Sequence, residues 1–203
     1  MFETRDMTTR SATHQTAVHY NQSITMPIFR PSQPNDIEQI TTIYAHHVLH
    51  GTGTFEMTPP TVAEMGQRRD DVLAKHLPYL VAVDGERVLG YAYCNWFKPR
   101  PAYRFSAEDS IYLAPDCAGQ GIGRALLAEL CAQAERWGVR RMISVIGDSA
   151  NQASIGVHRS VGFAPVGVLS ACGWKFGRWL DVVMMDKALG AGNTCPPDEV
   201  ITR

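Results

Sequence analysis

Three glycines at alternate positions are the feature of this sequence that most directly suggests chemistry. Gly119, Gly121 and Gly123 follow an apolar segment that ends at Leu113, and an amphipathic segment begins directly after them. A glycine-rich turn lets the backbone approach a ligand without obstruction by side chains. A helix that begins there points free N–H groups and its positive dipole end at the same ligand. This pattern is typical of a site for phosphate or pyrophosphate.

Several interpretations compete for this loop. A Walker loop needs Lys and then Ser or Thr after its last glycine, whereas Arg124 and Ala125 follow Gly123. A dinucleotide fingerprint needs glycine at position 124 or 126, which hold Arg and Leu. Two interpretations remain: a site for the pyrophosphate of coenzyme A, and a glycine-rich turn that binds no ligand.

Histidines and cysteines offer two other chemistries. His46 and His50 lie one helical turn apart, which suits a metal ion, but no third acidic or Cys ligand accompanies them. A zinc site needs three or four ligands, so we expect no metal. Cys117 precedes a helix start, which could lower the pKa of its thiol. No base that could activate this thiol as a nucleophile is identifiable, so a direct reaction without a covalent enzyme intermediate is preferred.

Composition excludes several classes of protein. The 203 residues carry 19 basic and 20 acidic side chains, for a net charge of -1. This balance argues against a nucleic-acid binder and against a polybasic membrane contact. No apolar run is long enough to span a bilayer. The five cysteines are odd in number and form no C-x-x-C pair, which favours a reducing compartment and a cytoplasmic location.

The elements that must hold the loop follow from apolar periodicity and from start and stop signals. Thr61 and Glu64 form a capping box, Gly138 and Gly162 end helices, and Gly85 turns a hairpin. Residues 97–104 read as a loop. Helices are expected at 37–47, from 61 to about His76, from 124 to Trp137 with Trp137 on the apolar face, and at 151–161; strands are expected at 28–30, 79–83, 88–95, 110–113, 142–146, 166–169 and 179–185.

Hairpins mixed with helices indicate an α+β fold rather than a purely parallel doubly wound sheet. The pattern covers 27–189, which we take as one domain. Residues 1–26 are rich in Thr, Ser, His and Gln and predict a disordered leader. A transit peptide stays open there because Arg5 and Arg10 are present, although Glu3 and Asp6 weigh against it. Residues 190–203 predict a flexible tail.

Several motifs, taken in order, resemble the GNAT superfamily of N-acetyltransferases. Within it, the chain is similar to the branch that acetylates phosphinothricin and methionine sulfone or sulfoximine. The motifs are residues 54–56, 100–103, 108–113, the glycine loop, 151–154, 158–163 and 175–181. The resemblance covers 27–189 and implies a single GNAT domain with a mixed central sheet flanked by helices.

The resemblance implies acetyl-CoA as cosubstrate. The family's loop has the form Gln/Arg-x-x-Gly-x-Gly/Ala, and Ala118 departs from its first position. We expect binding to survive, with weaker affinity as a possible effect, because backbone N–H groups do most of the holding. Helix capping explains Asn151 equally well. The implied cofactor-binding residues are Ile111, Tyr112, Leu113, Ala118, Gly119, Gln120, Gly121, Ile122, Gly123, Arg124, Asn151 and Ser154.

The resemblance also implies catalytic roles. Glu108, expected just before the strand that leads into the loop, is the general base that takes a proton from the amine; the alternative is an ordinary solvated acid beside Asp109. His158 stands where many members have Tyr and would protonate the leaving thiolate; a histidine that only packs or hydrogen-bonds on its helix explains it equally well. The N–H of Leu113 would stabilise negative charge on the thioester oxygen.

The implied acceptor is an α-amino acid with a phosphinate, sulfone or sulfoximine group, and the implied assembly is a homodimer. Its pocket should draw on Phe55, Glu56, Arg100, Tyr103, Lys175 and Arg178, with Trp179 as a further candidate. Arginine can grip a carboxylate or phosphinate with a bidentate fork. A core role explains Phe55 and Trp179 at least as well. A non-catalytic acetyl-CoA sensor and an acetyltransferase for a different small amine remain alternatives, and glycine spacing disfavours a nucleotide-dependent oxidoreductase.

Overall fold

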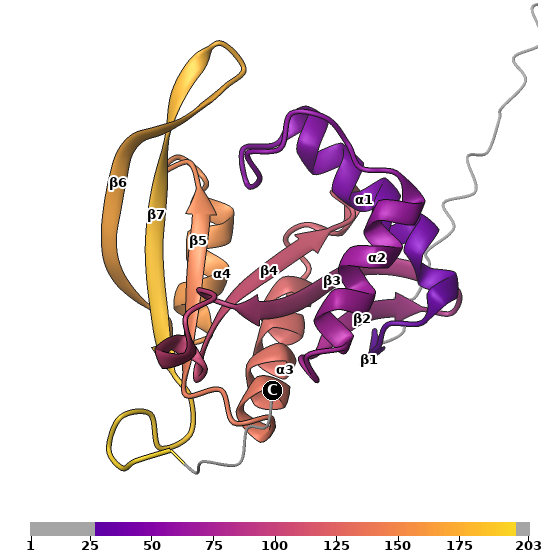
Figure 1. The fold of residues 1–203 in the computed structure, drawn as a ribbon. Coiled ribbons are helices and arrows are strands. Elements are labelled where there is room, and N and C mark those ends of the chain that lie inside the picture. The colour runs from indigo at the N-terminus through magenta and orange to yellow at the C-terminus, as the bar shows by residue number, and fades with distance from the viewer. Residues whose placement is uncertain (1–26, 198–203) are drawn as a thin grey trace, which may run out of the picture.

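The computed structural model describes residues 27–197 and consists of one mixed sheet with helices on both faces (Figure 1). The expected leader, 1–26, and the last six residues of the expected tail lie outside the described residues. The helices are α1 (Ile37–His50), α2 (Val62–Leu73), α3 (Ile122–Arg136) and α4 (Gln152–Ser160). The strands are β1 (Ile28–Pro31), β2 (Tyr79–Asp84), β3 (Arg87–Trp96), β4 (Ser106–Leu113), β5 (Arg141–Gly147), β6 (Ala164–Lys175) and β7 (Arg178–Ala188).

The sheet order is β1-β2-β3-β4-β5-β7-β6. Only β4 and β5 are parallel; every other neighbouring pair is antiparallel. Side chains of α1 pack on Tyr112 of β4, whereas α4 contacts Asp109 of the same strand. Residues separated by an odd number of positions in a strand face opposite sides, so the two helices cover opposite faces. The predicted α+β class with a mixed, helix-flanked sheet is confirmed.

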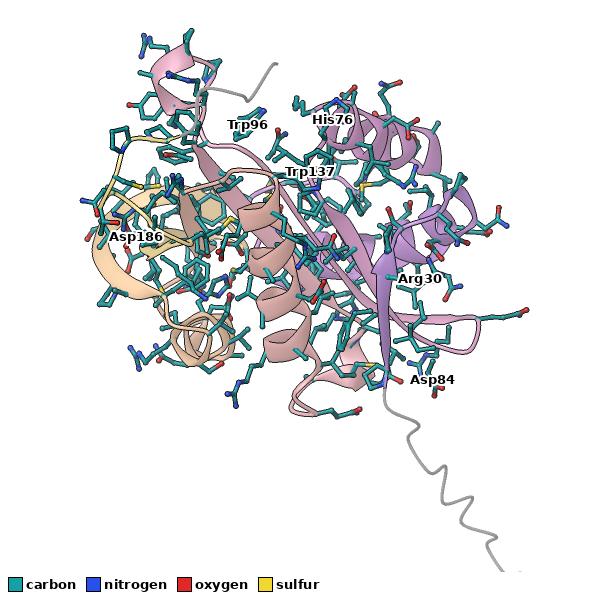
Figure 2. The ribbon with its side chains drawn as sticks, turned by 90° about the horizontal axis from the view of Figure 1, so that it is seen from below. Arg30, His76, Asp84, Trp96, Trp137 and Asp186 are labelled. Atoms are coloured by element: carbon teal, nitrogen blue, oxygen red, sulfur yellow. The ribbon has the colours of Figure 1, made fainter. Side chains whose placement is uncertain are left out.

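The capping box at the start of α2 is confirmed. Thr61 Oγ1 accepts the N–H of Glu64 at 3.2 Å, and Glu64 Oε2 accepts the N–H of Thr61 at 2.7 Å. The helix ends at Leu73, before the expected His76. The ring of His76 instead stacks on Trp137 at 5.6 Å, as Figure 2 shows for these two labelled residues.

Two expectations about elements are wrong. Trp137 does not face the core: it is 53% exposed, because α3 ends at Arg136 and Trp137 is its C-terminal cap. Glu108 does not precede its strand but lies inside it, because β4 begins at Ser106 and pairs with neighbours on both sides there. Residues 106–110 are mostly polar, so the sequence did not reveal this part of the strand. In the structure, Ala107 and Asp109 are buried and alternate with less buried neighbours, as in a strand.

The parallel pair β4–β5 separates halfway along. Their register covers only 106–109 of β4 against 141–144 of β5. Beyond that point β4 stays paired with β3, while β5 stays paired with β7. The two strands therefore diverge toward the end of β4, as Figure 1 shows. This divergence opens the sheet beside 111–113, directly before the glycine loop.

Candidate active site

Backbone groups of Leu113 face the opening between β4 and β5. Ala114 donates its N–H to the carbonyl of Leu89 at 2.9 Å, so Ala114 belongs to a hydrogen-bonded pair with β3. Leu113, opposite Gly90, is then in a non-hydrogen-bonded position, where N–H and C=O both point away from the partner strand. The end of β4 therefore directs the Leu113 N–H into the opening. The family resemblance implies that this N–H stabilises negative charge.

The glycine loop forms a backbone cradle at the start of α3. Gly119 and Gly121 have φ of 76° and 79°, in the left-handed region that favours glycine, and Gly121 is the N-terminal cap of α3. A Cβ at either position would meet no atom within 4 Å, so the backbone borders open space. Gln120 steadies the turn by donating to the carbonyl of Asp116 at 2.9 Å. The residues present thus fit a diphosphate held by main-chain amides.

The third glycine has a different reason. A Cβ on Gly123 would lie 3.3 Å from the side chain of Leu113 and 3.6 Å from that of Val157. Gly123 therefore lets α3 pack closely against β4 and α4. Asn151 caps α4, accepting the Ser154 N–H at 3.2 Å, so the capping explanation for Asn151 holds in this structure.

The environment of Cys117 does not activate its thiol. Burial raises the pKa of the Cys117 thiol, and the neighbouring Asp116 raises it further. A thiol in this environment stays protonated near neutral pH. The geometry supports no covalent route through this cysteine.

Glu108 projects from β4 on the same face as α1 and α2. It lies opposite Asn95 of β3, and it is half-buried. Burial raises the pKa of its carboxyl, and the charge of adjacent Asp109 raises it further. Glu108 is thus a partly desolvated carboxylate beside the opening rather than an ordinary solvated acid.

A second carboxylate, Glu56, lies nearby in a polar cluster. Tyr44 donates its hydroxyl to Glu56 at 2.9 Å, and Arg68 of α2 grips both oxygens at 2.6 and 3.2 Å. Burial raises the pKa of Tyr93; the charges of Glu108 and Glu56 also act on it, and Arg68 opposes them. The charges of Glu56, Arg68 and Glu108 therefore all act on the Tyr93 hydroxyl. Sequence reasoning missed Arg68, which resembles any solvated helix residue.

Phe55 and Lys175 tie the loop after α1 to the β6–β7 hairpin. Lys175 is buried, and its Nζ donates to the carbonyls of Gly51 and Thr54 at 2.9 and 2.8 Å. The ring of Phe55 lies against Gly173 and Gly147, where a Cβ would collide with it. Burial lowers the pKa of the Lys175 ammonium. In this structure Lys175 contacts backbone carbonyls of the loop that carries Glu56.

Within 27–197, the remaining acceptor candidates make no hydrogen bond or ion pair with Glu56. Arg100 and Tyr103 lie in the β3–β4 connection, at the opposite end of β4 from the glycine loop. Arg178 pairs with Asp148 at 2.6 Å. Trp179 is 62% exposed and packs edge-on against Trp174 at 5.2 Å, so a core role for Trp179 is wrong.

His158 is buried on the other face of the sheet, with 1% exposure. Its Nε2 lies 2.9 Å from Asp109 Oδ2, and its Nδ1 lies 2.7 Å from the carbonyl of Ser154. Both partners only accept, so both ring nitrogens donate and the imidazole is protonated. Burial lowers the pKa of His158, but the hydrogen bond and charge of Asp109 outweigh it and hold the pKa above its usual value.

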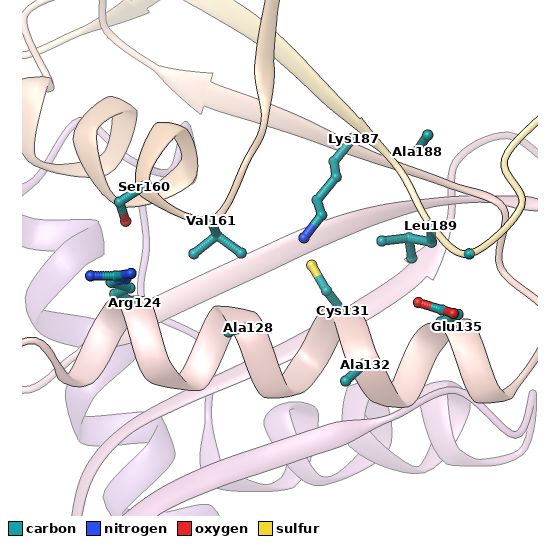
Figure 3. Close-up of a pocket in the computed structure, with 11 residues that line it drawn as sticks. Arg124, Ala128, Cys131, Ala132, Glu135, Ser160, Val161, Lys187, Ala188 and Leu189 are labelled. Atoms are coloured by element: carbon teal, nitrogen blue, oxygen red, sulfur yellow. The ribbon is translucent and has the colours of Figure 1, made fainter.

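A cavity of about 410 Å³ lies between α3, the end of α4 and β7, and none of Glu56, Glu108 and Leu113 lines it. Figure 3 shows Lys187 pointing toward Cys131 across it, with Arg124 near Ser160 at one end. It is therefore not the acceptor pocket. Within 27–197, no group of three or more His, Cys, Asp or Glu side chains could hold a metal ion. No helix in that range is long and apolar enough to cross a membrane.

Comparisons with known proteins agree with this geometry. A model described as the acetyltransferase (GNAT) family matches residues 42–163. The chain is 50% identical over 169 residues to phosphinothricin N-acetyltransferase of Alcaligenes faecalis, covering 83% of this chain and 86% of that protein. It is 36% identical over 162 residues to L-methionine sulfoximine/L-methionine sulfone acetyltransferase of Pseudomonas aeruginosa, covering 79% and 94%. The crystal structure of a phosphinothricin acetyltransferase from Sinorhizobium meliloti in complex with acetyl-CoA matches with a TM-score of 0.84 and 44% identity, covering 87% and 95%.

Proposed function

This chain belongs to the acetyltransferase (GNAT) family, and we propose that it transfers the acetyl group of acetyl-CoA to the amine of a small amino-acid analogue. One observation carries the proposal. A single strand, β4, holds a desolvated carboxylate at Glu108, directs the Leu113 N–H into an open sheet edge and leads into the glycine cradle. A base, an anion-stabilising amide and a diphosphate site thus lie in order along one rigid element.

The acceptor is an amino acid that resembles phosphinothricin or methionine sulfoximine or sulfone. The names of the relatives support this class. The predicted acceptor residues Phe55, Arg100, Tyr103, Lys175 and Arg178 stay proposals.

Acetyl-CoA would be held by the edge of β4 and by the loop. Main-chain N–H groups of 119–123 would hold the diphosphate, and the backbone of Ile111 and Leu113 would bind the pantetheine arm. Ala118, Gln120, Ile122, Arg124, Asn151 and Ser154 border the same region. Bound acetyl-CoA supplies an acetyl thioester that an amine can attack. No metal takes part in the proposed reaction.

Two side chains handle protons. Glu108 accepts a proton from the attacking amine, directly or through water; its raised pKa makes it a stronger base than an exposed glutamate. His158 supplies a proton to the departing thiolate. Its contacts with Asp109 and Ser154 keep the ring charged. Donation to the thiolate requires one of these two N–H bonds to break, because both ring nitrogens are engaged and the side chain is buried. The N–H of Leu113 donates to the acetyl oxygen as negative charge develops there.

The assembly is a homodimer formed through β6 and β7. Most of β6 is exposed, and apolar side chains gather there and at the hairpin tip: Val166, Val168, Leu169, Trp174, Phe176 and Trp179. Large contiguous apolar surfaces are unusual on monomers and mark protein contacts. All five cysteines are free, which supports a cytoplasmic location.

One experiment tests the function. The purified full chain is incubated with acetyl-CoA and, separately, with phosphinothricin, methionine sulfoximine, methionine sulfone and a set of ordinary amines. We expect release of free CoA thiol and an N-acetylated product with the amino-acid analogues. Tight binding of acetyl-CoA without any product would indicate the sensor instead, and product only with other amines would refute the acceptor class.

A further inference from the structure

His47 connects α1 to the end of β4 at the residue whose amide faces the opening. Its Nε2 lies 2.8 Å from the carbonyl oxygen of Leu113, a contact between residues 66 positions apart in sequence. The imidazole also packs on Tyr112, with ring centroids 5.3 Å apart. Its neighbours His46 and His50 are exposed, and their ring centroids lie 4.9 Å apart with the rings tilted by 47°. Only the middle of the three histidines therefore reaches the candidate site.

The protonation state of His47 follows from its partners. Burial lowers the pKa of the ring; the Leu113 contact opposes this, and the charges of His46 and Lys175 lower it further. The ring is therefore neutral near pH 7. Because a carbonyl oxygen only accepts, the single proton of the neutral ring must be on Nε2. His47 is thus a fixed donor to the Leu113 carbonyl.

This bond bears directly on the Leu113 N–H. In a non-hydrogen-bonded strand position, the N–H and C=O of one residue point in the same direction, here into the opening. A bare carbonyl oxygen would oppose negative charge developing beside the N–H. By donating to that oxygen, His47 occupies it and also fixes the backbone angles of Leu113. The N–H is then the group that an incoming acetyl oxygen meets.

We propose that His47 is a positioning residue for acetyl transfer, which orients the Leu113 amide and masks the Leu113 carbonyl. The proposal rests on the proposed function, since it assumes that the Leu113 N–H receives the acetyl oxygen. His47 itself acts through Leu113. The positioning role also explains why His47 is half-buried on a helix whose other two histidines face solvent.

The test compares three variants. His47→Gln keeps an N–H donor near the place of Nε2, His47→Ala removes it, and His50→Ala is the matched control on the same helix. We measure kcat, KM for both substrates and the acetyl-CoA dissociation constant by calorimetry. We expect His47→Ala to lower kcat roughly 10- to 100-fold, somewhat less than the loss of an oxyanion donor itself, with the dissociation constant within about threefold. His47→Gln should recover most of kcat, and His50→Ala should match the parent chain.

A second readout is independent of turnover. Proton–nitrogen NMR of the protein without ligand should show the Nε2–H tautomer of His47 at neutral pH. The Leu113 amide signal should move in His47→Ala and return toward its original position in His47→Gln. If His47→Ala fails to fold, His47→Asn replaces it, because its shorter amide cannot reach the carbonyl.

Each result is decisive. An unchanged kcat in His47→Ala, a His47→Gln variant as slow as His47→Ala, or an unmoved Leu113 signal overturns the positioning role. If the parent chain binds acetyl-CoA but acetylates nothing, the proposed function fails, and the positioning role fails with it even where NMR finds the His47–Leu113 bond. Activity in the parent with no effect of His47→Ala refutes the inference alone.

Discussion

Glu108 and Asp109 are adjacent in β4 and direct their carboxylates to opposite faces of the sheet. Asp109 pairs with His158 at 2.9 Å under α4, whereas Glu108 lies on the Tyr93 side, under α1 and α2. The alternation of a strand thus separates two neighbouring acids into different environments. One acid holds a buried cation, and the other is the proposed base.

Replacing Glu108 by Gln should remove the base. We expect kcat at neutral pH to fall roughly 100- to 1,000-fold, a usual range for loss of general base catalysis. Burial and Asp109 raise the pKa of Glu108 above its ordinary 4.5, so the acid limb of kcat/KM in the parent should lie above pH 4.5. That limb should vanish in the variant. Glu86→Gln, on the exposed β2–β3 turn, is the control; turnover unchanged at every pH in Glu108→Gln would refute the role.

The Asp109–His158 pair makes a prediction about pH. Because Asp109 raises the pKa of His158 in the folded state, its stabilisation is present below the unfolded value of 6.5 and is lost as pH rises through the folded pKa. Asp109→Asn should cost about 3–5 kcal/mol of unfolding free energy at pH 6, since a buried charge loses its partner. The difference from the parent should shrink by pH 9, as urea unfolding can measure.

Variants of Asp109 and His158 can also show whether His158 acts in catalysis or only in packing. If His158 donates a proton, the alkaline limb of the kcat profile reports its pKa. Asp109→Asn should then shift that limb to lower pH, and His158→Gln should abolish it while lowering kcat. A maximal rate that His158→Gln leaves unaltered would leave the histidine with a structural role only.

Gly121 should be needed for its backbone conformation. The Cβ of an alanine at position 121 would meet no neighbouring atom. A residue with a side chain at a φ of 79° is nevertheless strained by roughly 1–2 kcal/mol. Relief of that strain would move the amides of the cradle, so we expect acetyl-CoA affinity to fall about tenfold, as roughly 1.4 kcal/mol implies. Gly156→Ala is the control, because Gly156 has open space in the middle of α4. Equal affinities in calorimetry would exclude the loop as the diphosphate site.

The dimer surface can be tested with matched tryptophans. Trp174 on β6 is 57% exposed, and Trp137 at the end of α3 is 53% exposed. Trp174→Glu places a charge in the proposed interface and should yield monomers in light scattering after size exclusion. Trp137→Glu should leave the dimer intact. A parent chain that is monomeric at all concentrations would refute the interface.

Local patterns predicted most of the fold but only part of the site. The capping box at Thr61 and the strand–glycine–helix order depend on neighbours in sequence, so they can be read directly. The contacts of Glu56 with Arg68, Asp109 with His158, and His47 with Leu113 span 12, 49 and 66 residues. Such pairs depend on strand register and helix placement, which one sequence does not reveal.

The buried ammonium of Lys175 has a consequence for protein engineering. It fastens the 51–56 segment to the β6–β7 hairpin through two carbonyls, and Gly173 leaves the space that the Phe55 ring fills. These segments are more than a hundred residues apart in sequence, but these contacts hold them against each other. A chimaera between relatives that exchanges either segment must therefore carry 51–56 and 173–178 together, because either piece alone would meet a partner of the wrong shape.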